Sequence, residues 1–226
     1  HLTPFEEIFE AKCINEMVFS LLLPDNEMNS GFLVIGGVNK RLISEPVNFY
    51  PLISEKYWEI ELTSIKVSGK EITNCRGSKN KICRAIFDSG TTGFAGPSRI
   101  MVQLKEILNV ASKLAYSLLP TITITFGETD YELGPEDYML YEGDDRTKKN
   151  IPLEEKKVAL MPVDLSDDED IFILGAIFMR KYVTVYDGVR SELGIAAKNP
   201  NWKEDDDDLK LASELDEVQG LSQWNK

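Results

Sequence analysis

The sequence predicts a mainly β fold with a few short helices, and three observations support this class. Short apolar segments of strand length recur along the chain, and glycines and polar turns such as PDNEMNSG separate them. Helical spacing and capping signals are confined to a few segments. The chain has 226 residues, of which 42% are hydrophobic, which is enough to bury one sizeable core.

The first helix is predicted in LTPFEEIFEAKCI. Thr3 can cap it, Pro4 suits the first helical position, and Glu6 completes a capping box. Cys13 lies four residues after Phe9 on the expected helix face, which predicts that it is a small buried apolar residue.

Strand candidates follow in the first half of the chain. They are MVFSLLL, GFLVIGGV, NFYPLI, YWEIELTSIKVSG and KICRAIFD, which cover 17–23, 31–38, 48–53, 57–69 and 81–88. The longest of them places Trp58, Ile60, Leu62 and Ile65 in an imperfect alternation that still favours a strand.

In the second half, SRIMVQLKEILNVA predicts an amphipathic helix from residue 98. Its apolar residues recur at helical spacing, at Ile100, Met101, Leu104, Ile107, Leu108 and Ala111. Strands resume in 119–140, where FGETDYEL predicts a hairpin, and YVTVYD and ELGIAA form a last pair around GVRS. The polar segments 142–157 and 166–170 predict exposed loops.

Charge and composition exclude several functions. The chain carries 38 acidic and 25 basic residues, a formal net charge of −13, which argues against nucleic acid and anionic membranes as partners. The lone histidine is His1, so a histidine-based triad or a histidine-ligated metal site is not expected. No apolar run approaches the ~20 residues of a membrane span. Because the chain begins with His1 and has no basic-then-apolar leader, we expect a fragment or a processed product.

The composition changes after Ala197. We therefore expect a folded domain in 1–197 and an acidic, flexible, solvated tail in 198–226.

Cys75 and Cys83 bracket RGSKNKI, a polar segment typical of a hairpin tip. Two cysteines across a hairpin end can meet disulfide geometry, which predicts a bridge and an oxidising compartment. The alternative is two free thiols on a loop.

AIFDSGTTGFAGPSR, residues 85–99, places Asp88 on a tight turn at the end of an apolar strand. An Asp before Ser-Gly is common as plain turn chemistry. Here, however, Thr91 can donate its hydroxyl to the carboxylate, and the glycine allows the backbone to approach closely. Such donors stabilise the ionised form of an acid in an apolar setting, which favours a catalytic carboxylate.

This segment resembles the second catalytic loop of the pepsin-like aspartic proteases. LTPFEEIF, SGFLVIGGVN, PLISEKYWEIELTSIKVSG, the Cys75/Cys83 pair, LPTITITFGETDYELGPEDYML and IFILGAIFMRKYVTVYD also follow in family order. The resemblance runs from about residue 2 to Ala197. It implies half of a pepsin-like acid protease, the carboxyl-terminal lobe of a two-lobed enzyme that hydrolyses polypeptides. We expect no metal or other cofactor.

The resemblance also implies roles for individual residues. Asp88 is then a catalytic aspartate, and Ser89 ties the two lobes together. Gly90 lies against the catalytic pair, and Thr91 bonds the outer oxygen of Asp88. Other residues expected to line the substrate cleft are Tyr57, Ile86, Thr92 and Ile173. The sequence departs from the family at Leu160, near an expected cysteine, and at Ala176, where an acid is usual.

The family mechanism uses two aspartates that share one proton, because one must act as a base while the other is protonated. This sequence has no second Asp-Thr/Ser-Gly motif. The nearest candidate, Asp187-Gly188, lacks the Thr or Ser between the two residues. We therefore expect an amino-terminal lobe as partner, little activity without it, and a secretory, acidic vacuolar or extracellular location. The alternatives are a non-catalytic peptide- or protein-binding module, and a homodimer that pairs two copies of Asp88, although this lobe is much larger than the compact protomers that work that way.

Overall fold

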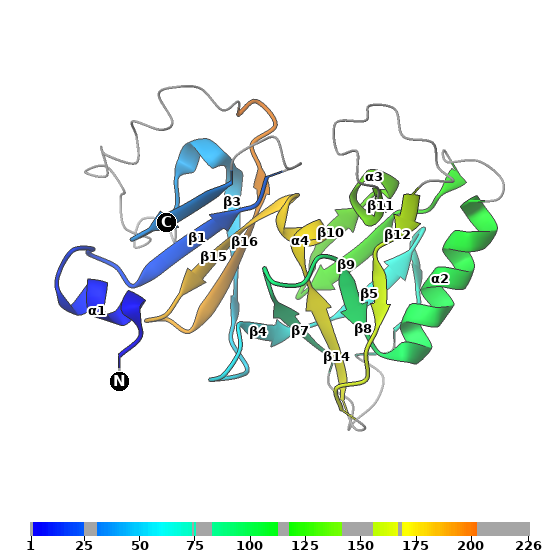
Figure 1. Cartoon of the computed structure of the whole chain (residues 1–226), viewed down its shortest axis with the longest axis horizontal. Coiled ribbons are helices and arrows are strands. Elements are labelled where there is room, and N and C mark those ends of the chain that lie inside the picture. The colour runs from blue at the N-terminus through cyan, green and yellow to red at the C-terminus, as the bar shows by residue number, and fades with distance from the viewer. Residues whose placement is uncertain are drawn as a thin grey trace. The chain divides into compact units, whose positions relative to one another are not determined.

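The computed structural model describes residues 2–24, 31–73, 75, 83–112, 118–141, 156–166 and 169–202 (Figure 1). The chain divides into two compact units. The first comprises His1–Pro51 with Met179–Lys226, and the second comprises Leu52–Phe178. Each is mainly β within the described residues, as the sequence predicts.

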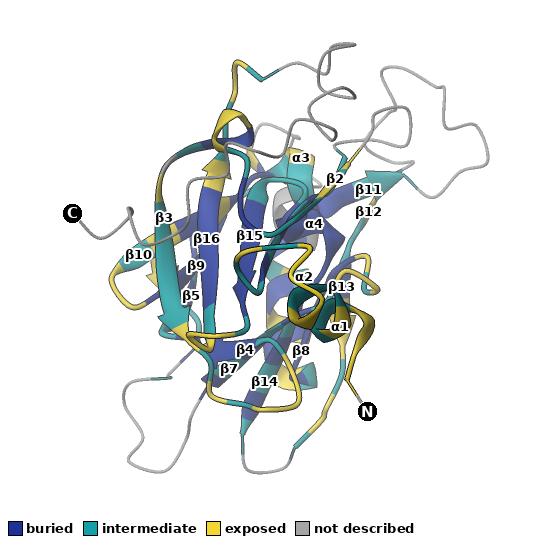
Figure 2. Cartoon of the chain, turned by 90° about the vertical axis from the view of Figure 1, so that its left-hand side faces the viewer, coloured by how far each residue is buried: buried dark blue, intermediate teal, exposed yellow. Residues whose placement is uncertain are grey.

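The first unit contains a five-stranded sheet in the order β2-β1-β15-β16-β3. Its elements are α1 (Pro4–Glu10), β1 (Val18–Leu22), β2 (Phe32–Ile35), the 3-10 helix η1 (Lys40–Leu42), β3 (Ile43–Pro51), β15 (Tyr182–Asp187) and β16 (Glu192–Lys198). The predicted pair YVTVYD and ELGIAA is confirmed as the antiparallel β15 and β16. These two strands are buried over most of their length (Figure 2).

The predicted start of α1 is confirmed, but the prediction for Cys13 is wrong. The Glu6 N–H donates to the Thr3 hydroxyl at 3.3 Å, and the Thr3 N–H donates to the Glu6 carboxylate. The helix ends at Glu10, and Lys12 has a φ of 58°, so the chain turns before Cys13. Cys13 therefore lies beyond the helix face and is exposed.

Apolar side chains from both ends of the sequence form the core of the first unit. The buried residues are Val18, Leu22, Val38, Leu42, Ile43, Val183, Val185 and Ala196. Trp202 packs against this core, with its ring 5.3 Å from that of Phe32 and the Lys198 Nζ 5.5 Å from its ring centre. Ordered packing thus extends past Ala197 to Trp202, and residues 203–226 of the predicted tail lie outside the described part.

The second unit contains three sheets among its described residues. Their strand orders are β13-β8-β14-β7-β4, β10-β9-β5-β6 and β11-β12. The strands are β4 (Glu59–Glu61), β5 (Ser64–Val67), β6 (Lys70–Glu71), β7 (Cys83–Phe87), β8 (Phe94–Gly96), β9 (Ile122–Phe126), β10 (Thr129–Leu133), β11 (Met139–Tyr141), β12 (Lys156–Val158), β13 (Leu160–Pro162) and β14 (Asp170–Leu174). The helices are α2 (Ser98–Ser112), α3 (Pro135–Tyr138) and α4 (Ala176–Met179), the last of which ends at the division between the units.

Most predicted elements of this unit are confirmed. FGETDYEL forms the β9–β10 hairpin, and α2 buries Ile100, Met101, Leu104 and Leu108. The segment 57–69 is two strands, β4 and β5, which belong to different sheets. This division explains the imperfect alternation, because the face that points to the core changes between the two strands. The predicted loop 142–157 ends early, since Lys156 and Lys157 belong to β12, and 142–155 lie outside the described residues.

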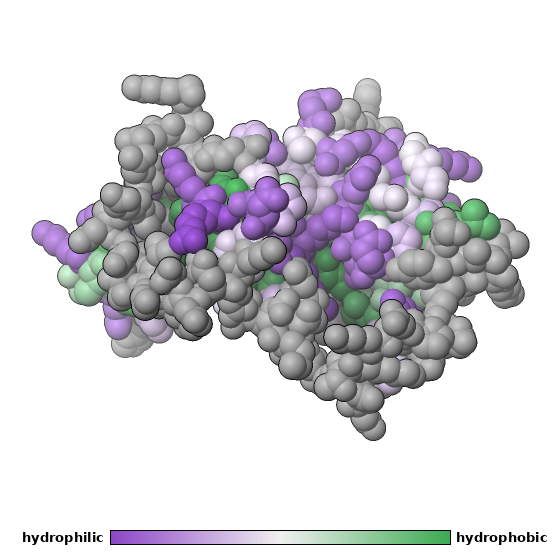
Figure 3. Space-filling view, turned by 90° about the horizontal axis from the view of Figure 1, so that it is seen from above, coloured by the Kyte–Doolittle hydropathy of each residue, from purple (hydrophilic) through white to green (hydrophobic). Residues whose placement is uncertain are grey.

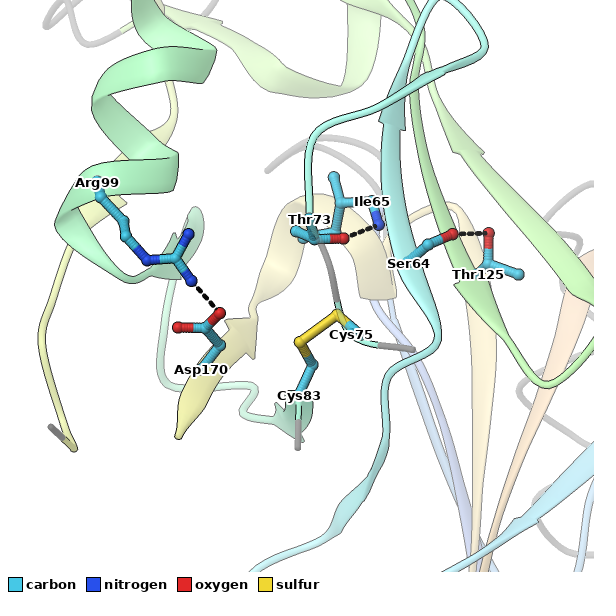
Figure 4. The surroundings of a disulfide bond; sticks show 8 residues. All are labelled: Ser64, Ile65, Thr73, Cys75, Cys83, Arg99, Thr125 and Asp170. Carbon is cyan, nitrogen blue, oxygen red and sulfur yellow. Dashed lines mark hydrogen bonds and ion pairs between the residues drawn. A yellow bond between two sulfur atoms is a disulfide. The ribbon is translucent and has the colours of Figure 1, made fainter. Parts of the chain in front are cut away.

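The prediction that 166–170 form an exposed loop is wrong at its last residue. Asp170 begins β14, and its side chain is 5% exposed. Burial of this charge is compensated by an ion pair with Arg99 of α2 (Figure 4). The predicted disulfide is present beside it, because Cys83 is the register partner of Asp170 and is bonded to Cys75, with the two Cα atoms 5.3 Å apart. The RGSKNKI segment lies outside the described residues.

Hydrophilic residues predominate among the described residues on the face seen in Figure 3. This surface agrees with the high proportion of charged residues, 28% of the chain. Within the described residues, no helix has the length and apolar character needed to cross a bilayer.

Candidate active site

Asp88 follows directly after strand β7, and the packing of this strand fixes the position of its backbone. Cys83, Ala85 and Phe87 alternate into the core, as expected for a strand with one buried face. The Phe87 ring lies 5.8 Å from that of Phe126 and 5.6 Å, edge to face, from that of Phe178. The residue before Asp88 is therefore held by aromatic packing.

The Asp88 carboxylate receives a hydrogen bond on each oxygen. The Gly90 N–H donates to Oδ1 at 2.9 Å, and the Thr91 hydroxyl donates to Oδ2 at 2.7 Å. The turn is closed by the Thr91 N–H, which donates to the Asp88 carbonyl at 3.2 Å. Asp88 is partly buried, and these hydrogen bonds orient its carboxylate. A carboxylate held in this way can act as a general base toward water or, when protonated, as an acid.

Backbone hydrogen bonds join the Asp88 turn to β14 and α4. The Asp88 N–H donates to the Leu174 carbonyl at 3.1 Å, and the Gly175 N–H donates to Gly93 at 3.1 Å. The Ala176 N–H donates to the Thr91 carbonyl at 2.7 Å. A Cβ on Gly175 would lie 2.1 Å from that same carbonyl oxygen, so this close approach requires glycine.

The predicted cleft residues lie on or next to the strands that carry Asp88. Ile86 and Ile173 are register partners in the parallel β7–β14 pair, and both are partly buried. Tyr57 is 59% exposed, and the carbonyl of the next residue, Trp58, accepts a hydrogen bond from the Phe87 N–H at 3.0 Å. The remaining predicted residues, Ser89 and Thr92, are exposed on the turn. Their roles toward a substrate or a second lobe stay predictions.

Sequence reasoning missed a charged group on the same sheet. Arg84 of β7 pairs with Glu169 at 2.8 Å, and its guanidinium is 3.8 Å from the carboxylate of Glu59 on β4. The available signal was an arginine among apolar residues in CRAIFD, four positions before Asp88. In the described part of the chain, no three acidic, histidine or cysteine side chains come together as metal ligands.

The mainly β fold and the Asp-Ser-Gly-Thr turn are those of a pepsin-like aspartic protease. The chain belongs to the eukaryotic aspartyl protease family, whose model matches residues 1–198. It is 30% identical over 191 residues to plasmepsin VIII of Plasmodium berghei, covering 79% of this chain and 50% of that protein. It is 28% identical over 202 residues to pepsin A of Rhinolophus ferrumequinum, covering 85% and 48%. Cathepsin E of Aquarana catesbeiana is 31% identical over 180 residues, covering 76% and 42%. The chain thus spans about half the length of the curated relatives it matches.

Proposed function

We propose that this chain is the carboxyl-terminal lobe of an aspartic endopeptidase and supplies one of two catalytic aspartates, Asp88. The observation that carries the proposal is the arrangement around its carboxylate, with Gly90 donating to one oxygen and Thr91 to the other. The two donors orient the carboxylate of a partly buried acid at the end of a strand, which suits a general acid or base. Family membership supports the same chemistry.

In this proposal, the second aspartate comes from an amino-terminal lobe. The two carboxyl groups share one proton, since two like charges at short distance do not both ionise readily. The ionised carboxylate removes a proton from water, whose oxygen attacks the peptide carbonyl carbon. The protonated carboxyl group donates to the carbonyl oxygen, and the resulting tetrahedral diol collapses with protonation of the leaving amine.

The substrate is then a polypeptide that lies across the face of the sheet at Asp88. Tyr57, Ile86 and Ile173 offer apolar contacts beside the carboxylate, and the turn at 90–92 lies against the peptide. Ser89, exposed on the turn, is the proposed contact with the amino-terminal lobe. The Cys75–Cys83 disulfide favours the secretory pathway, an acidic vacuole or the cell exterior as the compartment.

The test is Asp88→Asn in the complete two-lobed enzyme. This substitution removes the charge at constant shape, so the fold should persist while hydrolysis of an unfolded protein at acidic pH falls by at least about 1,000-fold. Glu106→Gln on the exposed side of α2 removes one negative charge elsewhere and should leave hydrolysis unchanged. Near-normal turnover by the Asp88→Asn enzyme would refute the proposal. Peptide binding without turnover in the unsubstituted protein would support a binding module instead.

A further inference from the structure

The face of β7 that ends at Asp88 carries a second charged side chain, Arg84. Side chains alternate along a strand, so Arg84 and Ile86 point to the same side, opposite to the buried Ala85 and Phe87, and Asp88 follows directly after the strand. Arg84 lies roughly 13 Å from Asp88 along the strand, at about 3.3 Å per residue. The side chain between them is the apolar, partly buried Ile86.

Arg84 joins three neighbouring strands at this end of the sheet. Its Nη2 lies 2.8 Å from Glu169, directly before β14, and its Nη1 lies 3.8 Å from Glu59 on β4. We call Glu59, Arg84 and Glu169 the Arg84 cluster. The Glu59 side chain is only 6% exposed, and the Arg84 Nε is buried without a hydrogen-bond partner in the described part of the chain. Solvent therefore screens these charges less than it screens surface charges.

Other charges near the cluster are accounted for. Glu61 is the register partner of Arg84 on β4 and is exposed. Asp170 is paired with Arg99 of α2, which offsets its charge. Of the two acidic residues on β4, Glu59 is the buried one and the nearer to Asp88 in register, because it pairs with Ile86, whereas the exposed Glu61 pairs with Arg84.

We propose that Arg84 is a positioning residue for Asp88. At one end of the β7–β14 pair, Arg84 holds β7 between β4 and β14. At the other end of the same pair, the Asp88 N–H donates to the Leu174 carbonyl. Together with Glu59, Arg84 also sets the electrostatic potential at the proton that Asp88 shares with the second catalytic aspartate. This inference rests on the proposed function.

The experiment follows kcat/KM against pH in the complete two-lobed enzyme. The alkaline limb is the informative one. Activity falls there because the catalytic pair loses its shared proton, so the midpoint of this limb measures how readily that proton is lost. Arg84→Met removes a positive charge and should move the midpoint of this limb up by ~0.5 pH unit. Glu59→Gln removes a negative charge and should move it down by a similar amount. The double variant should return the midpoint to near its original value.

Two controls separate charge from structure. Arg84→Lys keeps the charge and should keep the midpoint. Lys66→Met removes a positive charge from the exposed pair with Asp130 on the other sheet, and should also leave the midpoint unchanged. If Arg84→Met does not fold, Glu59→Gln and Arg84→Lys still test the inference.

Unchanged midpoints in Arg84→Met and Glu59→Gln, or shifts in the same direction, would overturn the inference and leave Arg84 a purely structural residue. That result is distinct from failure of the proposed function. In the latter case, the Asp88→Asn enzyme stays active whatever the Arg84 variants do.

Discussion

Thr91 orients the Asp88 carboxylate through one short side-chain hydrogen bond, 2.7 Å from its hydroxyl to Oδ2. Thr91→Val keeps the shape and removes this donor. Because a hydrogen bond to a charged group contributes about 1.5–3 kcal/mol, we expect kcat of the complete enzyme to fall roughly 10- to 100-fold. KM should change little, since the bond acts on the proposed catalytic group. Steady-state kinetics on a peptide substrate measures both.

Thr91→Ser is the matched control, because it restores the hydroxyl without the methyl group. Its kcat should lie close to that of the original enzyme. Equal losses in Thr91→Val and Thr91→Ser would show that packing of the methyl group matters and that the hydrogen bond does not.

At the scale of elements, the contact between β14 and the Asp88 turn depends on Gly175. A Cβ there would lie 2.1 Å from the Thr91 carbonyl oxygen and 2.5 Å from that of Gly93. Both are backbone atoms that hydrogen bonds hold in place. Gly175→Ala should therefore lower the free energy of unfolding by about 1–3 kcal/mol or more, as seen in denaturant titration.

Gly188→Ala provides the comparison for this prediction. A Cβ at Gly188 would meet the end of the flexible Met17 side chain at 3.1 Å, which can move. We expect a loss of at most about 0.5 kcal/mol. A Gly175→Ala protein as stable as the Gly188→Ala protein would contradict the close approach.

The first residue of α2 is capped from a distant loop. The Ser98 N–H and hydroxyl donate to the two Asp164 oxygens at 2.8 and 2.6 Å. These bonds, the hydroxyl first, lower the pKa of Asp164 below its usual value. A lowered folded-state pKa stabilises the fold at pH values above the unfolded pKa, and this contribution is lost as the pH falls through the folded one.

Asp164→Asn should therefore destabilise the protein at pH 7 and have little effect at a pH where the original carboxyl group is protonated. Urea unfolding midpoints at both pH values measure the difference. Glu71→Gln, at an exposed position on β6, is the control. It should change the urea midpoint little, and by the same amount at the two pH values. An Asp164→Asn effect that does not depend on pH would refute the role of the ionised cap.

Local patterns in the sequence predicted the elements that local forces decide. The capping box of α1, the apolar spacing of α2 and the β9–β10 hairpin were all recognised because their determinants are adjacent in the chain. Cys13 was misplaced because the helix ends at Glu10, and the turn at Lys12 has no strong sequence signal. Asp170 looked like part of a solvated acidic run because Arg99, which compensates its charge, is distant in sequence.

The candidate site shows the same division. Asp88, Gly90 and Thr91 form one short turn, so the donors could be predicted from adjacent residues. The contacts of Gly175 with Thr91 and Gly93 depend on how β14 pairs with its neighbours, so residues 85–99 by themselves give no sign of them. Only the resemblance to a family pointed to this strand.

At the scale of the whole molecule, we expect these 226 residues alone not to hydrolyse peptides. The proposed reaction needs two carboxyl groups in opposite protonation states, and this sequence has one Asp-Ser-Gly-Thr turn. The purified chain should be inactive on an unfolded protein at acidic pH. Adding or fusing an amino-terminal lobe with an Asp-Thr-Gly motif should produce activity. Robust cleavage by the chain alone that Asp88→Asn abolishes would instead indicate a homodimer.

The pairing of β7 with β14 also has a consequence during protein synthesis. Arg84 and Glu169 are 85 residues apart in sequence, and the Leu174 carbonyl that fixes Asp88 comes later still. A ribosome-bound chain that has exposed β7 therefore has no partner for that edge until β14 emerges, whereas the β9–β10 hairpin can already form. The Asp88 turn is thus among the last parts of its unit to reach its final geometry, and a nascent chain stalled before residue 174 carries the Asp88 sequence without its anchor.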